Sequence, residues 1–353
     1  MKKILTVIGA RPQFIKHAPV QKALRREFKE ITVHTGQHYD ERMSDIFFRE
    51  LKIRKPEYNL EVGSLTHGAQ TGLMMERLEK VIMKEKPDMV VIYGDTNSTV
   101  AASLTAAKLH IPVSHIEAGL RSFNMMMPEE INRIVADRLS ELLFAPTKEA
   151  VKNLKRENLK SIMTGDVMYD AFLYFEKMAE RINISDLILG LRRKSYVYMT
   201  IHREDNTLLT NMKRIIKNVQ KIKYPVIFPV HPRTQKVLNR LFEVRQGRIG
   251  NINLIEPQGY LDNLALLKGA AVLVTDSGGL QKEAYFAKVG TITVRSETEW
   301  IETVESGNNV LCPFADGIDG IVDVKRKIKY RDYYGDGKAS EKISLKIKEF
   351  LCR

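Results

Sequence analysis

Short runs of β-branched and apolar residues alternate along this chain with longer amphipathic segments. This alternation is typical of stacked strand–helix units whose strands form a parallel sheet. The pattern predicts ten strands in two series, separated near residue 170. The predicted strands are Ile4–Ile8, Ile31–Thr35, Met89–Tyr93, Val113–Ile116 and Leu142–Ala145, followed by Tyr196–Ile201, Val226–Val230, Ile252–Ile255, Ala271–Thr275 and Thr291–Val294.

Helices are predicted between the strands and at the end of the chain, at Ala18–Phe28, Gly68–Glu85, Thr99–Leu109 and Ala339–Leu351. The stretch 166–195 is helical and polar without a strong strand, so we place a domain junction near Asp170. The sequence therefore predicts an α/β fold of two Rossmann-like, doubly wound parallel-sheet domains that face a cleft, at 1–168 and 169–338. We expect the C-terminal helix, 339–353, to pack back on the first domain.

Composition agrees with this picture. The chain has 353 residues, which is longer than a chain that folds around one ordinary hydrophobic core, so two domains are expected. Its 44% hydrophobic and 28% charged residues are typical of a soluble globular protein. No apolar run approaches the roughly 20 residues of a membrane helix, and the apolar start ends too soon, at Arg11, for a signal peptide. Cys312 and Cys352 form no pairing framework, which fits a reducing cytoplasm.

The formal charge of +13 raises the question of an acidic partner. Nucleic acid is disfavoured, because Lys and Arg are spread through helical stretches beside Asp and Glu and no basic patch is interleaved with aromatic residues. A basic cleft for a small acidic substrate fits the charge better.

Unusual polar residues follow the predicted strands. In the first series they are Arg11, Gln37, His38, Asp95 and Glu117, and in the second they are His202, His231 and Ser277. Open parallel sheets bind ligands at the carboxyl ends of their strands. We therefore expect both sets of residues to line the cleft between the domains.

The stretch from Val272 to Ala284 is the most informative in the chain. A buried strand runs into Asp276, Ser277, Gly278 and Gly279, and a helix follows at once. Glycines let an anion approach the backbone, and the unpaired N–H groups of a helix start attract phosphate. Glu283 is then placed to hydrogen-bond a ribose attached to that phosphate. The alternative is an ordinary strand-to-helix turn capped by Ser277.

Arg11 precedes another helix start and Lys16 lies in its first turns. Cations there oppose the helix dipole, and a bound phosphate would relieve that cost; simple surface exposure is the alternative. The turn is not a GxGxxG dinucleotide fingerprint, and the chain has no P-loop and no nucleophile elbow.

Three carboxylates, Asp95, Glu117 and Glu130, are candidates for proton transfer. Asp95 could instead cap the helix that follows it, and Glu130 could complement a helix dipole, whereas Glu117 has no capping role. Metal-ligand patterns are weak, since His115-x-Glu117 lacks the cysteine pair of a zinc deaminase. We expect neither a metal nor a redox cofactor.

Taken together, these motifs resemble a known family. The resemblance rests on Gly9-Ala-Arg-Pro12, Gly36-Gln-His38, Gly94-Asp-Thr96, His115-Ile-Glu-Ala-Gly-Leu-Arg121, Pro128-Glu-Glu-Ile-Asn-Arg133, His202-Arg-Glu204, His231-Pro232 and Asp276-Ser-Gly-Gly-Leu-Gln-Lys-Glu283. The chain looks like a non-hydrolysing UDP-N-acetylglucosamine 2-epimerase over nearly its whole length. The resemblance implies a glycosyltransferase-B architecture, a homodimer, and conversion of UDP-GlcNAc to UDP-ManNAc without NAD or metal.

The resemblance also implies roles for individual residues. Asp95, Glu117 and Glu130 would form the acid/base set, and His202 would assist the departing UDP. The implied substrate-binding residues are Arg11, Lys16, Arg203, His231, Ser277, Gly278, Gly279 and Glu283.

Three departures from the family pattern stand out. Trp300 occupies a position where many relatives have Arg, for which Arg295 could substitute. Asn263 stands where relatives have a uracil-stacking aromatic, and Tyr260 could replace it. The glutamines of relatives regulated by a second substrate molecule are absent from 39–44, so we do not expect that regulation.

The sequence leaves other functions open. They are epimerisation of an oxidised or diacetamido UDP-sugar, a hydrolysing epimerase that releases ManNAc and UDP, a glycosyltransferase, and a nucleotide-binding module.

Overall fold

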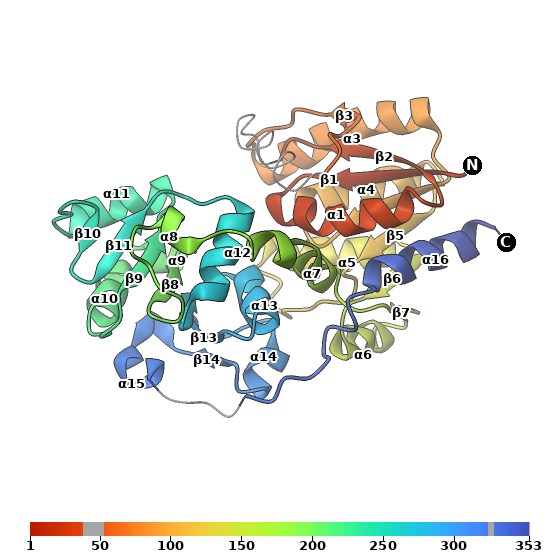
Figure 1. Ribbon diagram of the computed structural model, residues 1–353. Coiled ribbons are helices and arrows are strands. Elements are labelled where there is room, and N and C mark those ends of the chain that lie inside the picture. Colours follow the sequence, from red (N-terminus) through yellow and green to blue (C-terminus); the bar gives the residue numbers. More distant parts are fainter. Residues whose placement is uncertain (38–52, 324–327, 353) are drawn as a thin grey trace. The chain divides into compact units, whose positions relative to one another are not determined.

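The structure, a computed structural model, describes residues 1–37, 53–323 and 328–352 (Figure 1). Within these ranges the side chains of Arg11, Pro232 and Arg233 are not described. The chain divides into two compact units. The first unit contains Met1–Tyr174 and Asp332–Arg353, and the second contains Phe175–Arg331. No helix in the described ranges is both long and apolar enough to span a membrane.

The first unit is built on a seven-stranded sheet with the order β3-β2-β1-β4-β5-β6-β7, and each described strand pair is parallel. Its strands are β1 (Lys3–Ile8), β2 (Lys29–His34), β3 (Tyr58–Asn59), β4 (Met89–Tyr93), β5 (Val113–Ile116), β6 (Leu142–Ala145) and β7 (Ile162–Met163). Its helices are α1 (Arg11–Leu24), α3 (His67–Glu85), α4 (Asn97–Lys108), α5 (Pro128–Arg138), α6 (Lys148–Arg156) and α16 (Ala339–Leu351), and α7 (Val167–Ala179) continues into the second unit.

The second unit repeats this plan with the order β10-β11-β9-β8-β12-β13-β14, in which only the β10–β11 pair is antiparallel among the described pairs. Its strands are β8 (Val197–Thr200), β9 (Val226–Pro229), β10 (Arg248–Ile249), β11 (Ile252–Ile255), β12 (Val272–Thr275), β13 (Gly290–Thr293) and β14 (Asn309–Leu311). Its helices are α8 (Ile184–Leu187), α9 (Glu204–Thr207), α10 (Leu209–Val219), α11 (Pro232–Leu241), α12 (Tyr260–Gly269), α13 (Gly278–Phe286), α14 (Ile301–Glu305), the 3₁₀ turn η1 (Pro313–Ala315) and α15 (Ile318–Val322).

These observations confirm the predicted fold class of two parallel-sheet α/β domains. The central strands β4, β5 and β12 are fully buried, as expected when helices cover both faces of a parallel sheet. Helix α3 shows how the covering helices are anchored. Its buried residues Met74, Leu78 and Ile82 recur every four positions and pack on the apolar face formed by β1, β4 and neighbouring strands.

Strand order reverses once in each sheet, and these switch points position the site. In the first unit β1 and β4 are neighbours, and in the second β8 and β12 are neighbours. The chain leaves the two strands of each pair towards opposite edges of the sheet, because β1 is followed by β2 and β4 by β5, and likewise β8 by β9 and β12 by β13. The backbone therefore opens into a crevice at the carboxyl ends of these strands.

Helix α1 spans Arg11–Leu24, so the helix start expected at Arg11 and Pro12 is confirmed, whereas the bounds predicted for the segment Ala18–Phe28 are wrong. Pro19 lies inside the helix, where the missing N–H and the ring ordinarily break a helix. Phe14, Ile15 and Val20 are buried in the core, and this packing holds the helix together across the proline.

The C-terminal helix α16 packs on α1 within the first unit. Ser344 Oγ donates to the carbonyl of Ala23, and Lys348 pairs with Glu27 at 2.5 Å. The start of α16 is held by Asp170, whose carboxylate accepts the backbone N–H groups of Ala339 and Ser340.

Candidate functional site

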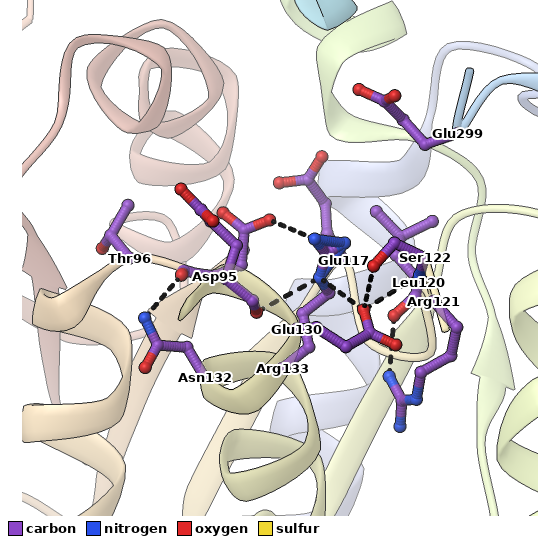
Figure 2. A network of polar contacts seen from close by, with 12 residues as sticks. Asp95, Thr96, Glu117, Leu120, Arg121, Ser122, Glu130, Asn132, Arg133 and Glu299 are labelled. Atoms are coloured by element: carbon purple, nitrogen blue, oxygen red, sulfur yellow. Dashed lines mark hydrogen bonds and ion pairs between the residues drawn. The ribbon is translucent and has the colours of Figure 1, made fainter. Parts of the chain in front are cut away.

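The carboxylates predicted from the sequence lie beside the switch point of the first unit. Asp95 follows β4 directly, with only Gly94 between it and the strand, and Glu117 follows β5. Glu130 is in the first turn of α5. Figure 2 shows these three side chains in one network of polar contacts.

Glu117 has an unusual backbone. Its φ is +70°, in the left-handed region that favours glycine, which for a residue with a Cβ costs about 1–3 kcal/mol. The side chain is 4% exposed and its carboxylate accepts a 2.5 Å hydrogen bond from Lys16 Nζ. Since strained residues cluster at functional sites, the backbone of Glu117 supports a functional role rather than a merely structural one.

Asp95 is the half-buried member of the set. Its side chain is 36% exposed, and Oδ2 lies 3.5 Å from Arg133 Nη2. Burial raises the pKa of the Asp95 carboxyl above its ordinary value; the charges of Arg133 and Lys16 oppose this rise, while that of Glu117 adds to it. The capping alternative does not hold for Asp95, because Thr96 is the N-cap of α4 and accepts the N–H of Thr99. A raised pKa and partial exposure suit a group that exchanges protons.

Glu130 is different, because its carboxylate is occupied. The residue is 1% exposed, and its oxygens accept hydrogen bonds from Ser122 N at 2.9 Å, Ser122 Oγ at 3.0 Å and Phe123 N at 2.9 Å (Figure 2). Arg133 Nε lies 3.5 Å from Oε2. Glu130 therefore fixes the loop before α5, and Arg133 connects it to Asp95.

In the second unit a buried carboxylate organises the switch point. Asp276 follows β12 and is fully buried. It accepts the backbone N–H groups of His202 and Arg203, at 3.1 and 2.9 Å, and the side chain of Asn206 at 3.0 Å. The ring of His202 stays 54% exposed, with Nδ1 3.4 Å from Asp276 Oδ1. Asp276 thus fixes the turn after β8 and leaves the imidazole available to a ligand.

Helix α13 begins at Gly278, as the sequence predicted, and it leaves its first N–H groups without a side-chain cap. Ser277 occupies the N-cap position but makes no side-chain capping bond. A Cβ on Gly279 would meet nothing within 4 Å, so the backbone there is open to a ligand. A Cβ on Gly278 would lie 2.2 Å from Glu299 Oε1, so this glycine makes room for a carboxylate of the protein itself.

Glu299 is held at that position by arginines. Its Oε2 is 2.9 Å from Arg295 Nη1, and Oε1 is 3.9 Å from Arg203 Nη2. Burial alone would raise the pKa of Glu299, but the charge of Arg295, a backbone hydrogen bond and Arg203 together bring it below its ordinary value. The sequence suggested Arg295 as a substitute for the missing family arginine, and in the structure its guanidinium binds Glu299.

The remaining predicted residues are placed as follows. Glu283 is buried in α13, and His231 is exposed and lies two residues after the end of β9. The side chain of Arg11 and the whole of His38 lie outside the described residues. Tyr260 is 4% exposed, with its ring 5.3 Å from that of Phe175, so it does not present an open face for stacking.

Within the described ranges no group of three His, Cys, Asp or Glu side chains is arranged to hold a metal ion.

The sequence pattern gave no separate role to Arg133, Asp276 or Glu299, which connect the predicted residues to one another. A signal existed for two of them. Arg133 is three residues after Glu130, the spacing of neighbours on one helix face, and Asp276 is the first polar residue after a buried strand. Glu299 is brought to α13 only by tertiary folding.

Comparisons with known proteins show which family the chain resembles. A family model described as UDP-N-acetylglucosamine 2-epimerase matches residues 22–348. A UDP-N-acetylglucosamine 2-epimerase homolog of Methanococcus maripaludis is 48% identical, with 97% of this chain and 98% of the relative covered. The UDP-2,3-diacetamido-2,3-dideoxy-D-glucuronate 2-epimerase of Pseudomonas aeruginosa is 45% identical, with 99% of each chain covered.

A solved structure is also similar. The crystal structure of Methanocaldococcus jannaschii UDP-GlcNAc 2-epimerase in complex with UDP-GlcNAc and UDP is 40% identical, with a TM-score of 0.88 and 99% of each chain covered. Its similarity extends over both parallel-sheet units and so includes both switch points. The chain therefore belongs to the UDP-N-acetylglucosamine 2-epimerase family.

Proposed function

We propose that this protein is a non-hydrolysing UDP-N-acetylglucosamine 2-epimerase that interconverts UDP-GlcNAc and UDP-ManNAc. The observation that carries the proposal is the set of carboxylates at the first switch point, in which a strained Glu117 pairs with Lys16 and a half-buried Asp95 has a raised pKa. Epimerisation at C2 requires a proton to be removed from carbon on one face and returned on the other, which is the work of such carboxylates.

The proposed reaction has two halves. A carboxylate takes the proton from C2 of the sugar while the C1–O bond to UDP breaks, and a C1–C2 double bond forms in a 2-acetamidoglucal. Protonation of C2 on the opposite face, with return of the UDP oxygen to C1, gives the epimer. UDP returns to C1 and a proton is added at C2, so the reaction consumes no redox cofactor.

The contacts of the acidic residues support a different role for each in this proposal. Asp95 is the candidate for proton exchange with C2, since burial has raised its pKa towards the working range of a general base. Glu117, held by Lys16, is the second candidate. Glu130 serves the loop, because its oxygens already accept three hydrogen bonds.

In this proposal the second unit holds UDP. The open backbone at Gly279 and the start of α13 accept the diphosphate, and Glu283 accepts the ribose hydroxyls. His202, exposed and attached to Asp276, donates to the departing phosphate oxygen. The diphosphate charge that develops as C1–O breaks is thereby stabilised.

A second candidate substrate is a UDP-2,3-diacetamido-uronate. A relative named for that substrate is 45% identical over 99% of both chains. Trp300, at a position where many relatives have Arg, lies with its ring 4.0 Å from Lys282 Nζ. Because the chain differs from many relatives at this position, the two UDP-sugars are to be compared directly as substrates.

The test is incubation with each UDP-sugar in D₂O, followed by proton NMR. We expect UDP-ManNAc to form from UDP-GlcNAc with deuterium at C2 and without accumulation of free UDP. Turnover of the diacetamido-uronate alone would transfer the proposal to that substrate, and stoichiometric free UDP would indicate the hydrolysing reaction. Product without deuterium at C2 would contradict the mechanism. Sedimentation of the same sample tests the homodimer that the resemblance implies.

A further inference from the structure

A buried cluster of charged side chains lies behind the carboxylates and is not explained by substrate binding. It consists of His115 on β5, Asp137 on α5 and Arg121 in the loop after β5. His115 and Asp137 are fully buried and the Arg121 side chain is 1% exposed. Charges so far from water persist only where each finds a partner.

Each of these groups has a partner. His115 Nδ1 is 2.7 Å from Asp137 Oδ1, and His115 Nε2 is 2.8 Å from the carbonyl of Gly94. The other oxygen of Asp137 accepts Gly119 N at 3.1 Å and lies 2.7 Å from Arg121 Nη1. Arg121 is in turn held by Glu157, through Nε at 2.7 Å and Nη2 at 2.9 Å.

The bond to Gly94 fixes one ring proton of His115. A carbonyl oxygen can only accept, so Nε2 of His115 carries a proton. Burial alone would raise the pKa of Asp137, but the hydrogen bond from His115 and the Arg121 guanidinium bring it below its ordinary value. Asp137 therefore favours its ionised form, and its two oxygens face His115 Nδ1, Gly119 N and Arg121 Nη1.

The two backbone groups in this cluster belong to the turns that carry Asp95 and Glu117. Gly94 immediately precedes Asp95; its carbonyl accepts from His115 and its N–H donates to Ile116 O at 3.0 Å. Gly119 is two residues after Glu117, and its N–H and carbonyl are bound by Asp137 and Asn153. Glu117 itself lies at a φ of +70°, which is strained for a residue with a Cβ and persists only where the surrounding backbone is held.

We propose that His115 and Asp137 are positioning residues, which hold the Asp95 and Glu117 turns in register for proton transfer through hydrogen bonds to the peptide groups of Gly94 and Gly119. This inference rests on the proposed epimerase function. Neither residue touches the substrate; the pair acts through the peptide groups of Gly94 and Gly119. An ångström of misplacement at a reacting group costs on the order of 100-fold in rate.

The chain offers a matched control in His17. This histidine is also fully buried, with Nδ1 3.0 Å from Tyr93 Oη and Nε2 3.1 Å from Thr32 Oγ1. Burial lowers the pKa of His17, in spite of the nearby Glu30, so its ring is neutral. His17 is not bonded to either carboxylate turn.

The experiment compares His115→Gln, Asp137→Asn and His17→Gln by kcat, KM, folded fraction from circular dichroism, and the isotope effect of C2-deuterated substrate. For the first two variants we expect kcat to fall on the order of 100-fold, KM to stay within about threefold and the isotope effect to rise, because proton transfer becomes slower relative to other steps. His17→Gln should lower stability but keep kcat per folded molecule within about threefold.

If kcat of His115→Gln falls only in proportion to the folded fraction and the isotope effect is unchanged, the positioning role is overturned. The proposed function would remain intact in that case. A wild-type protein inactive on both UDP-sugars would overturn the proposed function and the positioning role with it. Histidine-¹⁵N NMR gives the independent readout. The ring signals missing from the His115→Gln spectrum should include an Nε2–H group in the wild type, and a bare Nε2 would contradict the bond to Gly94 on which the proposal rests.

Discussion

The ammonium group of Lys16 donates a 2.5 Å hydrogen bond to the carboxylate of Glu117, which lies 101 residues further along the chain. The bond connects the second turn of α1, the helix that follows β1, with the residue after β5, the strand that lies beside β4. Lys16 was expected from the sequence to face a phosphate, and here it neutralises a nearly buried carboxylate. The two charges therefore balance each other within the protein.

Replacing Glu117 by glutamine is expected to abolish epimerisation, with kcat lower by at least about 100-fold, because the amide cannot exchange a proton with carbon. UDP affinity should stay within severalfold, since the nucleotide contacts come from other residues. Isothermal titration with UDP and the D₂O exchange assay measure the two effects. Glu149→Gln, at a half-exposed position on α6, is the matched control. Normal turnover in Glu117→Gln would remove this residue from the mechanism.

Replacing Arg133 by methionine should move the acid side of the pH–rate profile to higher pH. The charge of Arg133 lowers the pKa of Asp95, against the larger effect of burial, so its loss raises that pKa further. If Asp95 must be ionised to take a proton, less of it is active at a given pH, and kcat/KM near pH 6 should fall severalfold more than at pH 8. The exposed Arg138 on the same helix provides the control variant Arg138→Met. An equal loss at all pH values would contradict a proton-accepting Asp95.

The sequence predicted the long features of the fold and missed the short ones. All ten predicted strands are present within about two residues, since each is a buried apolar run of four to six residues. Strands β3, β7, β10 and β14 have two or three residues, too few to show a period, and were not predicted. The position of a residue after a strand was enough to select Asp95 and Glu117. It could not reveal that Ser122 and Phe123 occupy the carboxylate of Glu130, because hydrogen-bond partners are a property of the folded loop.

Replacing Asp170 by alanine should loosen the C-terminal helix. The carboxylate accepts the N–H groups of Ala339 at 3.1 Å and Ser340 at 2.6 Å, and α16 has no side-chain cap of its own at Lys338. Leaving these buried groups without an acceptor costs about 1–3 kcal/mol of unfolding free energy. Urea unfolding measures the loss, and hydrogen exchange should increase within 339–351. Glu341→Ala, at an exposed position of the same helix, should change neither quantity.

The two glycines at the start of α13 should respond oppositely to alanine. At Gly279 the new methyl group meets no neighbour, and alanine favours a helix by about 0.5–1 kcal/mol over glycine, so the melting temperature should rise. At Gly278 the methyl group would lie 2.2 Å from Glu299 Oε1, so the carboxylate must shift, which disturbs its bond to Arg295, and stability should fall. A Gly278→Ala, Glu299→Ala double variant should recover part of that loss, because the clash is gone.

UDP binding separates structure from function at this helix. Gly279→Ala should weaken UDP at least about tenfold despite its higher stability, because the methyl group occupies the space through which a phosphate approaches the N–H groups of α13. Titration calorimetry with UDP, and with uridine as the control that lacks phosphate, measures this directly. Unchanged UDP affinity in Gly279→Ala would mean that the diphosphate binds elsewhere. A glycine kept where alanine is more stable is then best explained by the ligand that it admits.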